Sequence, residues 1–383
     1  MAFLWHASPA VTNAKLCGIL YQARAGAGCM ASQSLKRAGG RGTASGMLVR
    51  RRFLHAAAAS LAGAGAFGLL PARAAHRHPA AARLAGDYAA FVAGIRREAI
   101  RQGLTADAVS HALDLSAPNT QVIARDRNQP EFHLTWAQYR SRVLTQRKID
   151  DGRAAFAARR AILEQQVLTR YDVAAGAVMG IWGLESAYGT ITGKFAVVDA
   201  LCTLAFEGRR AQFFHDELFH ALTILNAGDI TPELMTGSYA GAMGQPQFMP
   251  SAYLKYAVDI DGDGRRDIWH SMPDIFGSIA SYLAGSGWVA GETWGQEISV
   301  PDSVAQSALG RMQVRTLAQW MQMGITQPGG VPFARPEATG AVLRPDGPGG
   351  DAFMVYRNFA AIRRYNPSDF YALAVGLLGN EIT

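Results

Sequence analysis

One helix dominates the sequence pattern, because the side chains from Tyr171 to Tyr188 are mainly apolar and recur at helical spacing. Glu185 lies near the end of this helix, shortly after Ile181 and Trp182. A carboxyl group in apolar surroundings loses hydration, which disfavours its charged form and raises its pKa. The segment therefore predicts a carboxyl group suited to donate a proton near neutral pH. Taken alone, however, a glutamate near a helix end is more often a solvated residue than a catalytic one.

The remaining pattern predicts a mainly α (α+β) fold with a small β-containing insertion. Strand-like alternation occurs at 294–300, 341–344 and 352–357, and the turn residues Pro345–Gly350 separate the last two segments. Elsewhere the apolar residues recur at helical spacing. The expected divisions are a linker at 75–86, an N-terminal helical region at 87–170, a core at 171–290, the β-containing subdomain at 291–357, and a return to the core at 358–383.

The excess of positive charge lies at the N-terminus. Residues 1–74 hold nine of the 37 Lys and Arg residues and none of the 30 Asp and Glu residues. The rest of the chain therefore has 28 basic and 30 acidic residues, which is close to neutral. A nucleic-acid partner is not expected, because no excess of positive charge remains to bind a phosphate backbone.

The first 74 residues resemble a leader with a twin-arginine export signal. Arg50–Leu54 matches the twin-arginine core, an Ala- and Gly-rich run follows, and Ala72–Ala74 forms a small-x-small cleavage site. Met47 is a natural start for such a signal, so residues 1–46 are expected to precede the true start. The run is short for a membrane span, which needs about 20 apolar residues. We expect a soluble, monomeric periplasmic protein without a stable membrane span; an uncleaved N-terminal anchor is the alternative.

A second segment, Ser238–Ser251, combines glycines with Tyr239, Met243 and Phe248. It is not a phosphate-binding loop, because no Gly-Lys-Ser/Thr follows the glycines. Closely approaching backbone beside an aromatic ring and an amide suits a polar, ring-shaped ligand such as a sugar. A turn that only packs against the core is the alternative interpretation.

The third segment, residues 259–270, matches the D-x-D-x-D-G pattern of an EF-hand calcium loop. Its predicted ligands are the side chains of Asp259, Asp261, Asp263 and Asp267 and the backbone carbonyl of Arg265. His270 stands where the usual bidentate glutamate would be, which lowers the expected affinity for calcium. We expect one structural Ca²⁺ or Na⁺ here, with an unoccupied Asp/Gly turn as the alternative. A calcium sensor is disfavoured, because such proteins pair two loops and this chain has one.

Four motifs in this order resemble the lytic murein transglycosylase B family. They are Glu185–Gly189, Gly241–Ser251, Asp259–Asp267 and Tyr365–Ser368, and further agreement is found at Gln129–Phe132, Gly208–Arg210, Trp294–Gly295 and Asn358–Phe359. The resemblance extends from about residue 130 to about residue 378. It implies a lysozyme-like helical catalytic core, a β-containing side domain and a cleft that binds peptidoglycan glycan strands.

The resemblance also implies a single catalytic acid/base, Glu185, and no catalytic cofactor. The substrate-binding residues that it implies are Tyr188, Arg209, Arg210, Ser238, Gln247, Tyr282, Tyr365, Asn366 and Tyr371. Phe213 and Ala252 depart from the family, where a tyrosine and a serine are common.

A lone glutamate fits a lytic transglycosylase better than an ordinary glycoside hydrolase, which uses two carboxylates. The four nearby carboxylates are explained otherwise: Glu207 and Asp216 as partners of the Arg209–Arg210 pair, Asp199 as a helix cap, and Glu217 as a solvated residue. The implied reaction cleaves the MurNAc–GlcNAc β-1,4 bond and forms a 1,6-anhydroMurNAc end. The alternatives are a hydrolytic muramidase and an inactive peptidoglycan-binding protein.

Overall fold

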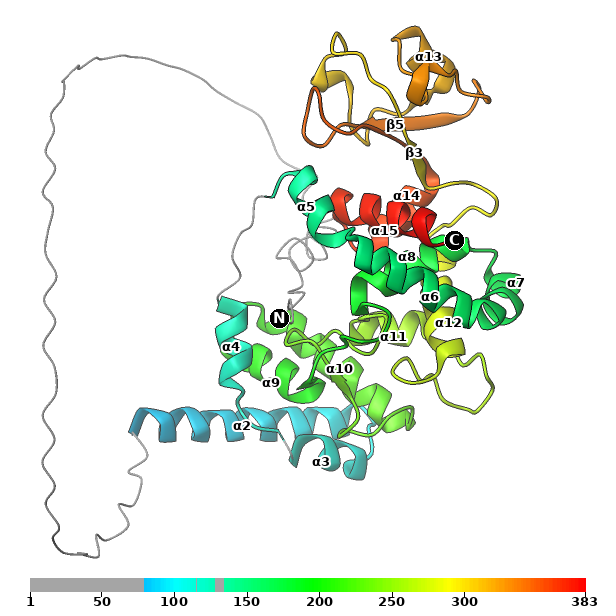
Figure 1. Ribbon diagram of the computed structural model, residues 1–383. Coiled ribbons are helices and arrows are strands. Elements are labelled where there is room, and N and C mark those ends of the chain that lie inside the picture. Colours follow the sequence, from blue (N-terminus) through cyan, green and yellow to red (C-terminus); the bar gives the residue numbers. More distant parts are fainter. Residues whose placement is uncertain (1–78, 115, 128–133) are drawn as a thin grey trace, which may run out of the picture.

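Helices account for most of the chain in the computed structural model, which describes residues 79–114, 116–127 and 134–383 (Figure 1). The leader at 1–74 and the Gln129–Phe132 motif lie outside these residues. Within the described part of the chain, no helix combines the length and apolarity that a membrane crossing requires. The expected linker at 75–86 is wrong from Pro79 onward, because the first helix begins there.

The N-terminal helices precede the helix that carries Glu185. They are α2 (Pro79–Arg101), α3 (Ala106–Asp114), α4 (Thr120–Arg127), α5 (Trp136–Val143) and α6 (Gln146–Ile162). A π-helical turn at Leu163–Leu168 and the short α7 (Thr169–Tyr171) continue α6. Thr135 and Thr145 cap α5 and α6, since their hydroxyl groups accept from the backbone N–H groups of Gln138 and Lys148.

The core consists of the helices α8 (Ala175–Ser186), α9 (Val197–Glu207), α10 (Ala211–Ala227), α11 (Pro250–Tyr256), α12 (Met272–Gly285), α14 (Arg357–Tyr365) and α15 (Asp369–Ile382). Among them, α8 packs against α12 and α15, and α10 packs against α9 and α11. Nearly every residue of α8 from Ala177 onward is buried, as its apolar sequence predicts. Glycines bring α8 and α15 together, because a Cβ atom on Gly180 would collide with the carbonyl oxygen of Val375.

Two small antiparallel sheets complete the fold. The strands β1 (Phe195–Ala196) and β2 (Thr236–Gly237) pair beside the core. The strands β3 (Gly295–Glu297), β4 (Arg315–Thr316), β5 (Thr339–Leu343) and β6 (Phe353–Val355) form a sheet in the order β3-β6-β5-β4. This sheet and α13 (Leu317–Gln322) form one end of the molecule (Figure 1) and enclose their own hydrophobic cluster around Trp320.

The β5–β6 turn ties this end of the molecule to α5. The carboxylate of Asp346 accepts from the backbone N–H groups of Trp136 and Ala137 at 2.6 and 2.9 Å, in the first turn of α5. Asp351 accepts from the indole of Trp136 at 2.8 Å and pairs with Arg140 at 2.7 Å. The carboxylate of Asp346 is therefore placed at the positive end of the α5 helix dipole.

Candidate active site

Glu185 lies in the last turn of α8, where the helix is stopped abruptly. Ala187, Tyr188 and Gly189 have positive φ angles of 47°, 58° and 83°. Residues other than glycine adopt this backbone conformation at a cost in free energy. The hydroxyl of Ser186 supports this reversal by accepting from the N–H of Gly189 at 3.1 Å. The reversal leaves the side chain of Glu185 partly exposed, although its neighbours Leu184 and Ser186 are buried.

A buried tyrosine holds the carboxyl group of Glu185. The hydroxyl of Tyr371, on α15, donates to Oε1 of Glu185 at 2.7 Å. Burial raises the pKa of the Tyr371 phenol well above its usual value, and the negative charge of Glu185 raises it further. Tyr371 therefore remains a protonated donor to this carboxyl group.

Three more tyrosines, on separate helices, lie close enough to Glu185 for its charge to act on their phenols, namely Tyr139, Tyr282 and Tyr365. Burial is the main cause that raises the pKa of each phenol, and the charge of Glu185 adds to it. The hydroxyl groups of Tyr282 and Tyr365 donate to the carbonyl oxygens of Arg364 and Pro246 at 2.7 and 2.6 Å. The structure thus brings three predicted tyrosines together around Glu185. It adds Tyr139, which lies on α5 outside the motifs that carry the resemblance.

The glycine-rich segment forms a tight loop against α8. The hydroxyl of Ser238 accepts from the N–H groups of Ala240 and Ala242 at 3.3 and 3.0 Å. Gln245, which sequence reasoning missed, accepts from the indole of Trp182 at 2.8 Å and donates to the carbonyl of Trp269 at 2.8 Å. A Cβ atom at Gly244 would lie 2.6 Å from a backbone oxygen, so the loop requires glycine there.

Two predicted substrate-binding side chains are held by the protein itself. The amide nitrogen of Gln247 donates to the carbonyls of Thr192 and Gly244, both at 2.9 Å. The hydroxyl of Tyr188 donates to the carbonyl of Lys148 at 2.9 Å, and its ring packs edge-on against Trp182. These groups fix the loop and the end of α8 in the structure described.

Asn366, at the end of α14, is different. It is 2% exposed, and its Oδ1 accepts no hydrogen bond from the described residues. A buried acceptor without a donor is costly, so such a group is typical of a site that receives a ligand or a water molecule.

The structure corrects the predicted charge partners of the arginine pair. Arg209 and Arg210 both bind the carboxylate of Asp126, at 2.6 and 2.8 Å, and Asp126 is only 2% exposed. Glu207 pairs instead with Arg127 at 2.8 Å. Asp216 also has other partners, Gln212 at 2.7 Å and His215 at 3.6 Å. The half-exposed Arg209 still presents part of its side chain to solvent.

The predictions for Glu217 and Asp199 are also wrong. Glu217 is buried, and it accepts from the N–H and the hydroxyl of Ser251 at 2.9 and 2.6 Å. Asp199 lies in the first turn of α9 rather than at its cap, Ala196, and burial raises the pKa of its carboxyl group. Glu217 therefore stabilises the start of α11 through Ser251, and Asp199 is a partly desolvated residue of the first turn of α9.

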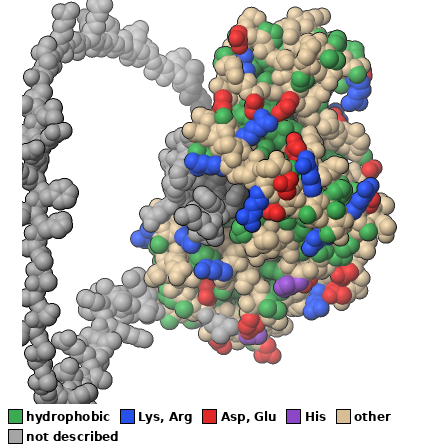
Figure 2. All heavy atoms as spheres, viewed as in Figure 1, with side chains coloured by type: hydrophobic (Ala, Val, Ile, Leu, Met, Phe, Trp, Pro, Cys, Tyr) green, Lys and Arg blue, Asp and Glu red, His purple; other side chains and the backbone are tan. Residues whose placement is uncertain are grey.

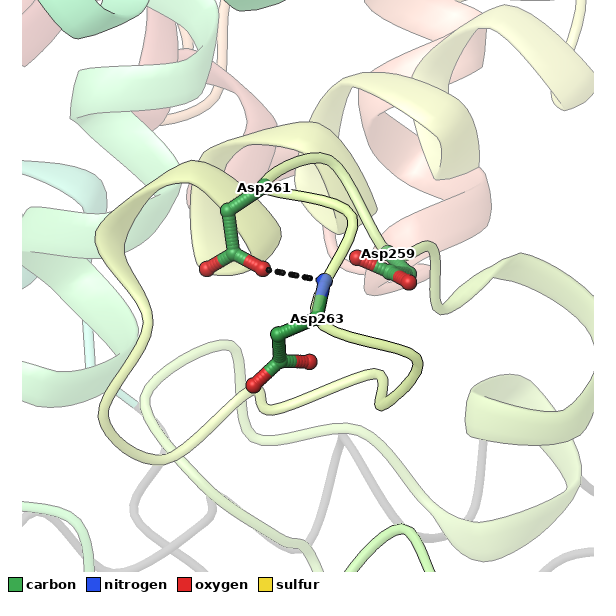
Figure 3. A group of neighbouring side chains, drawn as sticks. All are labelled: Asp259, Asp261 and Asp263. Atoms are coloured by element: carbon green, nitrogen blue, oxygen red, sulfur yellow. Dashed lines mark hydrogen bonds between the residues drawn. The ribbon is translucent and has the colours of Figure 1, made fainter.

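Three of the predicted metal ligands come together in the 259–270 loop. Carboxylate oxygens of Asp259, Asp261 and Asp263 all lie within 4.8 Å of one another (Figure 3). Each also accepts a backbone N–H of the loop, as Asp261 does from Asp263 at 3.2 Å. Such a group of hard oxygen donors suits Ca²⁺ or Na⁺. The guanidinium of Arg265 pairs with Asp263 at 3.1 Å.

Asp267 is not part of this group. Its carboxylate caps the following turn, where it accepts from the N–H groups of Trp269 and His270, both at 2.9 Å. Asp274, which sequence reasoning missed, stabilises the loop, because its carboxylate accepts from the backbone N–H groups of Ile260 and Asp267 at 2.7 and 2.9 Å. Burial raises the pKa of Asp274 to about 6.

Comparison with known proteins gives consistent matches. The family model described as "Transglycosylase SLT domain" matches residues 87–380. The membrane-bound lytic murein transglycosylase B of Escherichia coli (strain K12) is 33% identical over 294 residues, which are 75% of this chain and 77% of that protein. This match confirms the family resemblance.

Solved structures agree with the fold. SltB3 from Pseudomonas aeruginosa, in complex with NAG-anhNAM-pentapeptide, has 41% identity and a TM-score of 0.75, over 77% of this chain and 79% of that chain. The Escherichia coli lytic transglycosylase SLT35, in complex with calcium, has 29% identity and a TM-score of 0.64, over 77% and 92%. The predicted mainly helical, lysozyme-like fold is therefore confirmed.

Proposed function

The chain belongs to the transglycosylase SLT domain family, and from this premise we propose that it is a lytic transglycosylase of peptidoglycan. It cleaves the MurNAc–GlcNAc β-1,4 bond and leaves a 1,6-anhydroMurNAc end. The observation that carries the proposal is the Glu185 carboxyl group, which a protonated Tyr371 holds at the end of a buried helix. The similarity to SltB3, a protein crystallised with a NAG-anhNAM-pentapeptide, supports the same chemistry.

Glu185 serves in two proton transfers. The protonated carboxyl group first donates to the glycosidic oxygen as the bond to MurNAc C1 breaks. The resulting carboxylate, stabilised by the hydroxyl of Tyr371, then removes the proton from the MurNAc C6 hydroxyl, and this oxygen bonds to C1. The proton returns to Glu185, GlcNAc leaves with a free C4 hydroxyl, and no water is consumed.

One carboxylate suffices because the nucleophile is tethered to the sugar. An intramolecular hydroxyl reacts as if at a very high local concentration, so no second base is needed to activate water. The sugar's own N-acetyl carbonyl stabilises the positive charge that develops at C1.

The surrounding side chains form the walls of the substrate site. We assign Tyr282, Tyr365 and Tyr371 to the aromatic wall beside Glu185. We assign Asn366, whose buried Oδ1 accepts no hydrogen bond within the described part of the chain, to a hydrogen bond with the sugar. Ser238 and Gln247 hold the glycine-rich loop in shape. We assign Arg209 and Arg210, which bind Asp126, to the edge of the substrate site. Tyr188 supports the end of α8.

We further propose that the 259–270 loop holds a structural Ca²⁺ or Na⁺. Asp259, Asp261 and Asp263 would supply carboxylate oxygens and Arg265 its carbonyl. Asp267 would join them only if its carboxylate turned away from the N–H groups of Trp269 and His270. The calcium complex of SLT35 supports this assignment.

The cellular location is also proposed. The twin-arginine motif at Arg50–Leu54 favours export of a folded enzyme to the periplasm, with cleavage after Ala74. We propose that the exported enzyme is a monomer. On the face drawn in Figure 2, basic and acidic side chains are intermingled, which suits a neutral glycan better than a nucleic acid.

Digestion of purified sacculi in ¹⁸O-labelled water tests the reaction. We expect unlabelled 1,6-anhydroMurNAc ends, lighter than hydrolytic ends by one water, in the mass spectrum. The variant Glu185→Gln should fold normally and lose activity by a factor of at least about a hundred. Label at the MurNAc C1 oxygen would identify a muramidase, and absence of any cleavage by the wild type would indicate a binding protein.

A further inference from the structure

Lys148, on α6, contacts the last turn of α8 through both its side chain and its backbone. Its ammonium group donates to the carbonyl oxygen of Gly183 at 3.1 Å. Its own carbonyl oxygen accepts from the hydroxyl of Tyr188 at 2.9 Å. Gly183 and Tyr188 lie just before and just after Glu185 in the sequence. Lys148 therefore holds the turn that carries the carboxyl group on both sides.

The contact with Gly183 supplies a hydrogen-bond donor to a carbonyl group at the end of α8. The last carbonyl groups of an α-helix lack N–H partners within the helix. Here the N–H of Ala187 donates to the carbonyl of Trp182 rather than to that of Gly183. A lysine that donates to such a carbonyl also places positive charge at the negative end of the helix dipole, which is favourable.

The charge of Lys148 also acts on Glu185. Burial lowers the pKa of Lys148, and the negative charges of Glu185 and Asp151 oppose this effect by favouring the ammonium form. The interaction is mutual, so the ammonium group favours the carboxylate form of Glu185.

Other described groups that face Glu185 are phenols on neighbouring elements: Tyr139 on α5, Tyr282 on α12, Tyr365 on α14 and Tyr371 on α15. The pKa of each phenol is raised, so all four remain neutral over the working range of pH. A substitution of Lys148 therefore removes one positive charge near Glu185 and leaves these four phenols unchanged.

We propose that Lys148 is a positioning residue for Glu185, which caps the end of α8 and places a positive charge beside the catalytic carboxyl group. This inference rests on the proposed function, because it assumes that Glu185 is the acid. Glu185 must be protonated to start the reaction, so its ionisation sets the alkaline limb of the pH–rate profile. The ammonium group makes Glu185 a stronger acid and moves that limb to lower pH.

The test compares Lys148→Met, which keeps the aliphatic stem, with Lys148→Arg, which keeps the charge. The control is Arg147→Met, since Arg147 is the preceding residue of α6, has a 91% exposed side chain and pairs with Asp151 at 3.7 Å. Release of anhydro-muropeptides is measured across the pH range. The alkaline limb should rise by about one pH unit in Lys148→Met, the lower end of the effect of a neighbouring opposite charge. It should remain in place in Lys148→Arg and in the control.

A second readout does not depend on activity. Titration of ¹³C-labelled carboxyl groups by NMR, with the Glu185 signal assigned by its loss in Glu185→Gln, gives the pKa of Glu185 directly. We expect a higher value in Lys148→Met than in the wild type and in Arg147→Met. If the wild type released no anhydro product, the proposed function would fail while this comparison still decided the role of Lys148. A Lys148→Met protein with an unchanged Glu185 pKa would overturn the inference, whatever its rate.

Discussion

Replacing Tyr371 by phenylalanine removes one oxygen atom from the proposed active site and leaves the packing of α15 intact. The Tyr371 side chain is 1% exposed, and its hydroxyl donates to Glu185 at 2.7 Å. Phenylalanine fills nearly the same volume, so the variant should fold. The carboxyl group of Glu185 is partly exposed and can bind water in place of the phenol.

The size of the effect follows from the type of hydrogen bond. Bonds to a charged group contribute about 1.5–3 kcal/mol. Because about 1.4 kcal/mol corresponds to a tenfold change in rate, full loss of this bond from the step that forms the carboxylate predicts a fall in kcat of about tenfold to a hundredfold. The bond favours the charged form of Glu185, so its loss should also raise the pKa of Glu185 and move the alkaline limb to higher pH.

The assay is the rate of anhydro-muropeptide release at saturating substrate, followed by mass spectrometry at several pH values. The control is Tyr253→Phe, which removes a buried hydroxyl with an equally short bond, 2.7 Å to the carbonyl of Arg266. Tyr253→Phe should change the free energy of unfolding and not the pH profile. A Tyr371→Phe enzyme with the kcat and pH profile of the wild type would refute the proposed role of this hydrogen bond.

Two further predictions concern stability. Calcium should raise the melting temperature, because it binds the folded 259–270 loop. The variant Asp261→Ala should abolish this rise, whereas the control Asp302→Ala, at an exposed residue, should keep it. A wild-type melting temperature that responds neither to calcium nor to a chelator would contradict the metal site. Glu217→Ala should lower the free energy of unfolding in urea by roughly 3 kcal/mol, since it leaves the N–H and hydroxyl of Ser251 without an acceptor. The exposed Glu337→Ala serves as its control, and equal stability of the two variants would contradict this account.

The sequence was informative where the interactions are local. Helical spacing identified the buried helix with Glu185, and the Asp/Gly pattern identified a loop whose first three aspartates converge. Asp267 did not join them, because the turn after it offers two backbone N–H groups to its carboxylate. A ligand pattern alone does not reveal that competition.

Charge partners could not be predicted, because tertiary packing decides them. The sequence predicts partners for Arg209 among the acidic residues close to it, yet its partner Asp126 lies 83 positions away on α4. The sequence predicts a solvated side chain for Glu217, yet Glu217 is buried and binds Ser251, 34 positions away. In both cases the local sequence contains charged neighbours and no information about which helix will lie against them.

Glycines on α8 and α15 set the distance between Glu185 and Tyr371. Gly176 and Gly180 lie one helical turn apart on α8, and Cβ atoms at either position would press on the backbone of α15. Gly379 is equally crowded by the carbonyl of Gly176. These small residues let the two helix backbones touch, so Tyr371 on α15 reaches Glu185 on α8 with a short hydrogen bond. A larger side chain at Gly180 would separate the helices and lengthen that bond without altering any residue of the site itself.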